Sequence, residues 1–86
     1  MNQDEIIKKL KVQIVEQLNL EEIKPESIDT NAPLFGEGLG LDSIDALELI
    51  VLLEKNYGVR IQDPKEAKEI FVSVKTMADY VMAHAN

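Results

Sequence analysis

A serine flanked by aspartates is the group in this sequence best placed to do chemistry. The segment Asp42-Ser43-Ile44-Asp45 ends a glycine-punctuated loop and opens a run rich in leucine and isoleucine. Asp42 is a suitable helix N-cap, with Asp45 at the third helical position, which would leave the Ser43 hydroxyl free. The ordinary alternative is that Ser43 is itself the cap. Free N–H groups and the helix dipole favour a phosphate at such a position, whereas the two aspartates oppose one.

The helix expected to begin at Ser43 is apolar on two faces. One face contains Leu49, Ile50, Leu53 and Tyr57, and we expect it to point into the core. The other contains Ile44, Leu47 and Val51, with Asp45, Glu48 and Glu54 on or beside it. An apolar stripe rimmed by acids either packs under the preceding loop or meets a partner whose pocket is rimmed by basic residues.

Hydrophobic periodicity predicts four helices and no strand. We expect them at about residues 3–19, about 43–56, in a short segment from Asp63, and at about 73–85. The predicted inner positions are Ile7, Leu10, Ile14 and Leu18 in the first helix, and Val74, Met77, Ala78 and Val81 in the last. The long connection over residues 20–42 contains prolines and glycines that argue against a continuous helix. The sequence therefore predicts an all-α fold, a four-helix bundle with a long first loop and a short third helix, forming one domain over residues 1–86.

The net charge of −7 is carried by the middle of the chain. Residues 25–54 contain seven acids and no Lys or Arg, whereas the flanking segments cancel each other. Such a segment is either a solvated acidic surface or a docking surface for basic partners. Nucleic acid is not an expected partner, because phosphate backbones need clustered Lys and Arg.

Several function classes find no support in the residue types. The absence of cysteine excludes disulfides, thiol catalysis and cysteine-ligated metal, and no metal site is predicted. The only histidine, His84, is near the C-terminus, so Ser43 has no predicted base and we expect no enzyme activity. The acidic start and the absence of a long apolar run predict a cytoplasmic protein with no membrane span. A monomer is the expected oligomeric state.

Around Ser43 the sequence resembles the acyl carrier protein family. The match centres on Asp42-Ser43-Ile44-Asp45, continues through Leu47-Glu48-Leu49 and includes residues 54–58. It extends over essentially the whole chain, including residues 25–32, the helix start at Asp63 and residues 74–81. The departures are a longer, glycine-rich approach to the serine, Lys55 in place of an acid, and a third helix made less acidic by Lys65 and Lys68. They leave a dedicated carrier of a specialised pathway open beside housekeeping fatty acid synthesis.

The resemblance implies a right-handed four-helix bundle with 4′-phosphopantetheine attached to Ser43. A phosphopantetheinyl transferase would add the arm, and ketoacyl synthases, acyltransferases and other acyl-processing enzymes of fatty acid, polyketide or other specialised lipid synthesis would use it. The implied docking residues are Asp42, Ile44, Asp45, Leu47, Glu48, Val51 and Glu54. We expect the cargo to lie in the bundle interior, near Leu49, Ile50, Leu53 and Val81.

Two alternatives stay open at this point. The chain could carry an aminoacyl or D-alanyl group, or it could be a non-carrier helical interaction module in which Ser43 is only structural. The first is distinguished by the enzyme that loads the arm, and the second by whether an arm is added at all.

Overall fold

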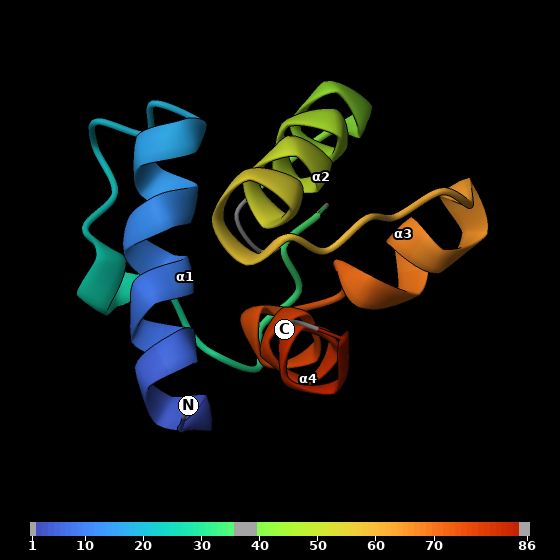
Figure 1. Ribbon diagram of the computed structural model, residues 1–86. Helices are drawn as coiled ribbons and strands as arrows, with labels where there is room; N and C mark the ends of the chain where they lie inside the picture. The colour runs from blue at the N-terminus through green and yellow to red at the C-terminus, as the bar shows by residue number, and fades with distance from the viewer. Residues whose placement is uncertain (1, 36–39, 85–86) are drawn as a thin grey trace.

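The computed structural model describes residues 2–35 and 40–84, and within them the chain is helical (Figure 1). An isolated parallel bridge between Phe35 and Leu41 is the only extended pairing in these residues. The elements are α1 (Gln3–Gln17), the 3₁₀ turn η1 (Pro25–Ser27), α2 (Ser43–Tyr57), α3 (Pro64–Ile70) and α4 (Val74–His84). The predicted all-α class and the four helices are confirmed.

The helix ends follow from local chemistry. α1 begins after Asn2, whose side chain accepts the Asp4 amide, and ends two residues earlier than predicted. Asn19 adopts a left-handed backbone with φ 56°, and the Leu20 amide reaches back to the Val15 carbonyl. This is a Schellman-type ending, in which Asn replaces the usual glycine.

The later boundaries lie within a residue or two of those predicted. α2 ends at Tyr57 and is followed by Gly58, whose φ of +67° suits glycine. Asp63 caps α3 through the Lys65 amide, with proline in the first turn. α4 begins after Ser73, because Ser73 and Thr76 exchange amide-to-hydroxyl hydrogen bonds. The predicted end of this helix, residue 85, lies outside the described residues.

The helices share one hydrophobic core, with α1 packed against both α2 and α4, and α3 against α4. In α1 the fully buried positions are Ile6, Leu10 and Ile14, spaced four residues apart. Ile7 and Leu18, predicted to point inward, are only partly buried. Ile7 lies at the edge of the buried face, and Leu18 falls at the end of the helix. In α4 all four predicted inner residues are buried.

The connection from α1 to α2 is anchored to the start of α4 and to the residues just before it. It passes along α1 through η1 and then crosses toward the start of α2 (Figure 1). The Lys75 amide donates to the Thr30 carbonyl, and the Leu34 amide donates to the Val72 carbonyl. Ile28 and Leu34 add buried side chains to the core. These contacts fix the chain shortly before the segment that leads to Ser43. Among the described helices, none has the length and apolar character needed to cross a membrane.

Candidate functional site

Ser43 occupies the first position of α2 with an exposed side chain. The helix is capped by Asp42, whose Oδ1 accepts the Ile44 amide at 3.0 Å and the Asp45 amide at 3.2 Å. Asp45 completes the capping box, because its Oδ2 accepts the Asp42 amide at 3.0 Å. The alternative in which Ser43 serves as the cap is therefore wrong. Its hydroxyl is left for other chemistry.

The capping box occupies part of the helix start. The amides of Ile44 and Asp45 are two of the donors that a helix start would offer to an anion, and Asp42 already accepts both. An anion placed there would compete with Asp42 for these amides and would meet the carboxylates of Asp42 and Asp45.

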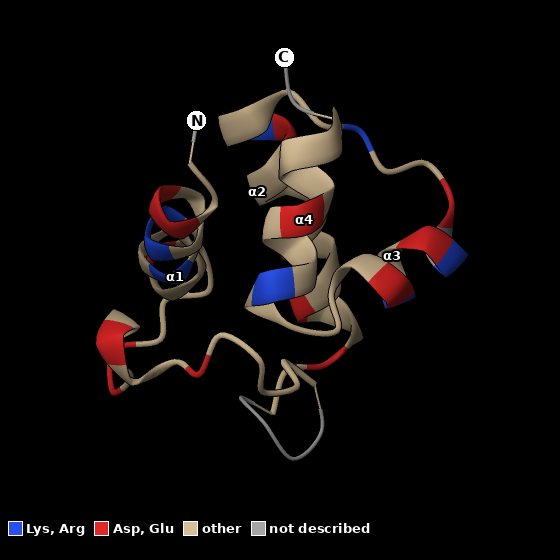
Figure 2. Cartoon of the chain, turned by 90° about the horizontal axis from the view of Figure 1, so that it is seen from below, with Lys and Arg blue, Asp and Glu red and all other residues tan. Residues whose placement is uncertain are grey.

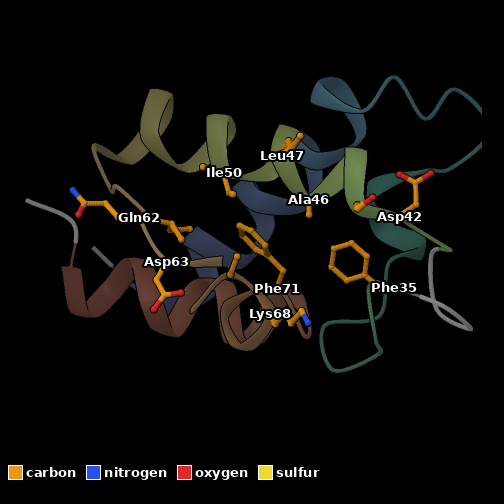
Figure 3. Close-up of a pocket in the computed structure, with 12 residues that line it drawn as sticks. Phe35, Asp42, Ala46, Leu47, Ile50, Gln62, Asp63, Lys68 and Phe71 are labelled. Atoms are coloured by element: carbon orange, nitrogen blue, oxygen red, sulfur yellow. The ribbon is translucent and has the colours of Figure 1, made fainter. Parts of the chain in front are cut away.

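A hollow of about 550 Å³ opens beside Ser43, between α2 and α3 (Figure 3). Phe35 and Phe71 lie opposite Ala46 and Ile50 of α2. Most of the wall's surface is apolar, although five of the twelve lining residues are polar or charged. The lining residues are Phe35, Asp42, Ser43, Ala46, Leu47, Ile50, Ile61, Gln62, Asp63, Ala67, Lys68 and Phe71.

The hollow does not coincide with the part of the bundle interior where a cargo was expected. Of the four residues expected near a cargo, only Ile50 lines it. Leu49, Leu53 and Val81 have no exposed surface and belong to the closed core. Ala46 and Ile50 are four residues apart on the flank of α2 that points toward α3. Sequence reasoning missed this flank because the facing residues, Phe35, Ile61 and Phe71, come from three separate segments.

A second flank of α2 presents apolar side chains outward. Ile44 is 69% exposed, Leu47 64% and Val51 49%. These exposures exclude the interpretation in which the three residues pack under the loop. We call this surface the α2 face. Large apolar side chains clustered on one exposed face mark interaction sites more often than scattered ones do.

The acids around the α2 face are held to different degrees. Asp42 and Asp45 are restrained by the capping box. Glu48 is partly buried, and its Oε2 accepts a hydrogen bond of 2.7 Å from Gln17 of α1. Glu54 is exposed and lies 3.7 Å from the Arg60 guanidinium. Because each of these contacts occupies a single oxygen, the other carboxylate oxygen of each acid stays available to a basic side chain of a partner.

Tyr57 links α2 to α1 through its side chain. The Tyr57 hydroxyl donates to Gln13 Oε1 at 2.7 Å, which adds a second polar tie between α1 and α2. Burial raises the pKa of Tyr57, and its hydrogen bond with Gln13 opposes part of that rise.

His84 stacks on Tyr80 near the end of α4, and its Nδ1 lies 3.0 Å from the Tyr80 carbonyl oxygen. In the part of the chain that the structure describes, no cluster of three or more His, Asp or Glu is arranged to hold a metal.

Comparison with known proteins gives two matches that span this site. Residues 8–81 match the family described as the phosphopantetheine attachment site. A relative named acyl carrier protein, from Thermosynechococcus vestitus, is 38% identical over 81 residues. That alignment covers 94% of this chain and 93% of the relative. Both matches include the end of the long connection, the start of α2 and the wall of the hollow.

Proposed function

Because this chain belongs to the acyl carrier protein family, whose members carry a phosphopantetheine cofactor, we propose that Ser43 is its attachment point. The observation that carries the proposal is the exposed hydroxyl left free by the Asp42 cap. A transferase would join the Ser43 Oγ to the phosphate of the arm as the pyrophosphate bond of coenzyme A breaks.

The residues at the start of α2 fit such an arm. An outward hydroxyl gives a modifying enzyme access, and the adjoining hollow offers an apolar surface to whatever the arm carries. When bound, the arm supplies the thiol that this cysteine-free chain lacks. The protein's own residues orient the arm, contact the cargo and meet the partner enzyme. Tethering raises the effective concentration of the cargo at the partner's active site.

The hollow favours an acyl cargo over an aminoacyl or D-alanyl one. A charged ammonium group loses hydration when it enters a mostly apolar space, whereas a hydrocarbon chain gains free energy there. Phe35, Ile50 and Phe71 supply the surface that such a chain would cover. The proposed cargo class is therefore an acyl or ketoacyl thioester of fatty acid, polyketide or other specialised lipid synthesis.

The α2 face is proposed as the docking surface for the enzymes that use the arm. Its exposed apolar residues begin with Ile44, next to Ser43, and continue along α2 through Leu47 to Val51, so a partner that covers them also reaches the arm. The acids Asp42, Asp45, Glu48 and Glu54 would attract basic residues on a phosphopantetheinyl transferase, a ketoacyl synthase or an acyltransferase. The cytoplasmic location, the monomeric state and the lack of enzyme activity stay predictions of the sequence.

Intact-mass measurement with a broad-specificity transferase, magnesium and coenzyme A tests the attachment. The wild-type chain should gain one phosphopantetheine, and Ser43→Ala should gain none. Ser27→Ala is the matched control, because Ser27 is also exposed but lies in η1. A wild-type chain that stays unmodified would instead favour the non-carrier interaction module.

A loading assay on the modified chain tests the cargo. An acyltransferase with a fatty acyl or malonyl donor should charge the arm. Charging by an amino-acid adenylating enzyme alone would support the aminoacyl alternative and contradict the proposed cargo class.

A further inference from the structure

The charges along the α2 face change sign from one end of the helix to the other. Ile44, Glu48, Val51 and Lys55 fall four, three and four residues apart, so they follow one line along α2. At the Ser43 end, the charged residues that α2 and its cap place along that face are the acids Asp42, Asp45 and Glu48. At the other end, Lys55 occupies the last turn and Arg60 follows shortly after. Figure 2 shows acidic positions near the start of α2, a basic and an acidic position side by side at its end, and a basic and then an acidic position in the segment toward α3.

The basic charge at the far end is available to a partner. Lys55 is exposed, and the positions three and four residues before it are Leu52 and Val51, which offer no carboxylate. Within residues 2–35 and 40–84, the ion pairs are Arg60 with Glu54 and Lys75 with Asp79. Arg60 therefore offsets the one acid at this end, and the charge of Lys55 is left over. Glu54, although one of the proposed docking acids, is offset at this end, so the charges there sum to a positive value, whereas those at the Ser43 end sum to a negative one.

We propose that the α2 face fits a partner with basic residues opposite Asp42, Asp45 and Glu48 and a carboxylate opposite Lys55. Between these charges the partner presents an apolar recess for Ile44, Leu47 and Val51. This inference rests on the proposed docking role of α2 and specifies its partner. The two charged ends are roughly 20 Å apart at 1.5 Å per helical residue, a distance that one protein interface spans.

The change of charge along the α2 face also fixes the direction in which the partner lies along α2. A partner placed end for end would bring its basic residues against Lys55 and its carboxylate against Asp42 and Glu48. Like charges in an interface disfavour the wrong arrangement, so the correct one is selected by both attraction and repulsion. The acids are held in place by the capping box and by Gln17, which limits their freedom to adapt. Ser43 is thereby brought to the partner's basic end.

Two helical peptides of equal length and identical apolar residues serve as probes. The bipolar peptide has three lysines at one end and two glutamates at the other, and the all-basic peptide replaces the glutamates with lysines. Each contains one tryptophan, and since the chain has none, fluorescence anisotropy reports the peptide alone. Binding is measured at low and at near-physiological salt, because exposed charge pairs weaken with ionic strength.

Wild type should bind the bipolar peptide more tightly than the all-basic one, despite its net charge of −7. The double variant Lys55→Glu with Arg60→Glu should reverse the preference, with a change in the ratio of the two affinities of about fivefold. Lys55→Gln with Arg60→Gln should give part of this change with less risk to folding. The matched control, Lys9→Glu with Lys65→Glu, makes the same charge change on α1 and α3 and should keep the wild-type preference.

Preference of wild type for the all-basic peptide would overturn the inference, as would an unchanged ratio in both α2 variants. Modification of Ser43 in the same proteins separates this outcome from failure of the proposed function. A chain that accepts phosphopantetheine but shows no bipolar preference keeps its carrier role and loses only the specified partner. A chain that is never modified loses the carrier role itself.

Discussion

The interface of α1 with α4 and the interface of α2 with α3 are built in opposite ways. On the first side Leu10, Ile14 and Met77 have no exposed surface and fill the space between the helices. On the second side the helices leave a hollow, where the small residues Ala46 and Ala67 line the wall. Protein interiors are normally packed without such gaps. The comparison indicates that stability resides mainly on the closed side, whereas the open side is the one that we propose for the arm and its cargo.

The largest loss of stability, on the closed side, should appear when one isoleucine on each side is truncated. Ile14→Ala removes a fully buried side chain and should lower the free energy of unfolding by about 3 kcal/mol, because a closed cavity remains. Ile50→Ala should cost about 1 kcal/mol, because Ile50 is only partly buried and already borders open space. Urea unfolding followed by circular dichroism measures both values. Equal losses would show that the hollow closes around Ile50 in solution.

Enlarging one alanine on each side should act with opposite sign. Ala46→Leu extends into the hollow and should leave the unfolding free energy unchanged or raise it by about 1 kcal/mol. Ala78→Leu on α4 has no space to fill and should lower it by about 2 kcal/mol. Thermal unfolding of the two variants gives the comparison.

The same pair of variants sharpens the proposed role of the hollow. An acyl chain sheltered there should be protected from hydrolysis of its thioester, and Ala46→Leu should reduce that protection. Ala78→Leu, in conditions where it stays folded, should keep it. Equal hydrolysis rates for all three proteins would place the cargo elsewhere.

Truncation of the cap Asp42 should lower the unfolding free energy more than truncation of Ser43, the proposed attachment residue, although by a smaller margin than in the comparisons above. Asp42→Ala removes a side chain that accepts two amides and should cost about 1 kcal/mol. Ser43→Ala should change the unfolding free energy by less than about 0.5 kcal/mol, since Ser43 is exposed and does not cap the helix. Urea midpoints compare the two. A loss at Ser43 as large as that at Asp42 would mean that the serine stabilises the helix after all.

The parts that sequence analysis predicts well depend on neighbours along the chain. Asp42 and Asp45 are three residues apart, so their capping box follows from helix geometry alone, and it places Ser43 correctly. The inner stripe of α4 is equally local, since every predicted residue is buried. The exposure of Ile44, Leu47 and Val51 could not be decided, because it depends on where the long connection runs.

The hollow is the feature that sequence analysis missed, since it depends on residues brought together by folding. Phe35 precedes α2 by several residues, Ile61 follows it and Phe71 ends α3. No periodicity links these positions, so nothing in the sequence pointed to this hollow, and the expected cargo space near Leu49 and Leu53 stays a prediction. The Gln17–Glu48 hydrogen bond is equally distant in sequence. Through this bond, Gln17 of α1 restrains Glu48, which the sequence predicted as a docking residue.

The smallest expected change in stability belongs to the α2 face, where the functional effect should be large. Ile44→Ala truncates a side chain that is 69% exposed and should shift the unfolding free energy by less than about 0.5 kcal/mol. If a transferase covers this face, the same variant should lower kcat/KM for modification of Ser43 by about tenfold, as expected for an apolar anchor in an interface. Val12→Ala on α1 is the matched control, with a similarly exposed apolar residue (43%) on another helix, and should leave the rate unchanged. A face that tolerates Ile44→Ala in both assays would be surface without a docking role, and the division between a closed stabilising side and an open working side would then be limited to the hollow.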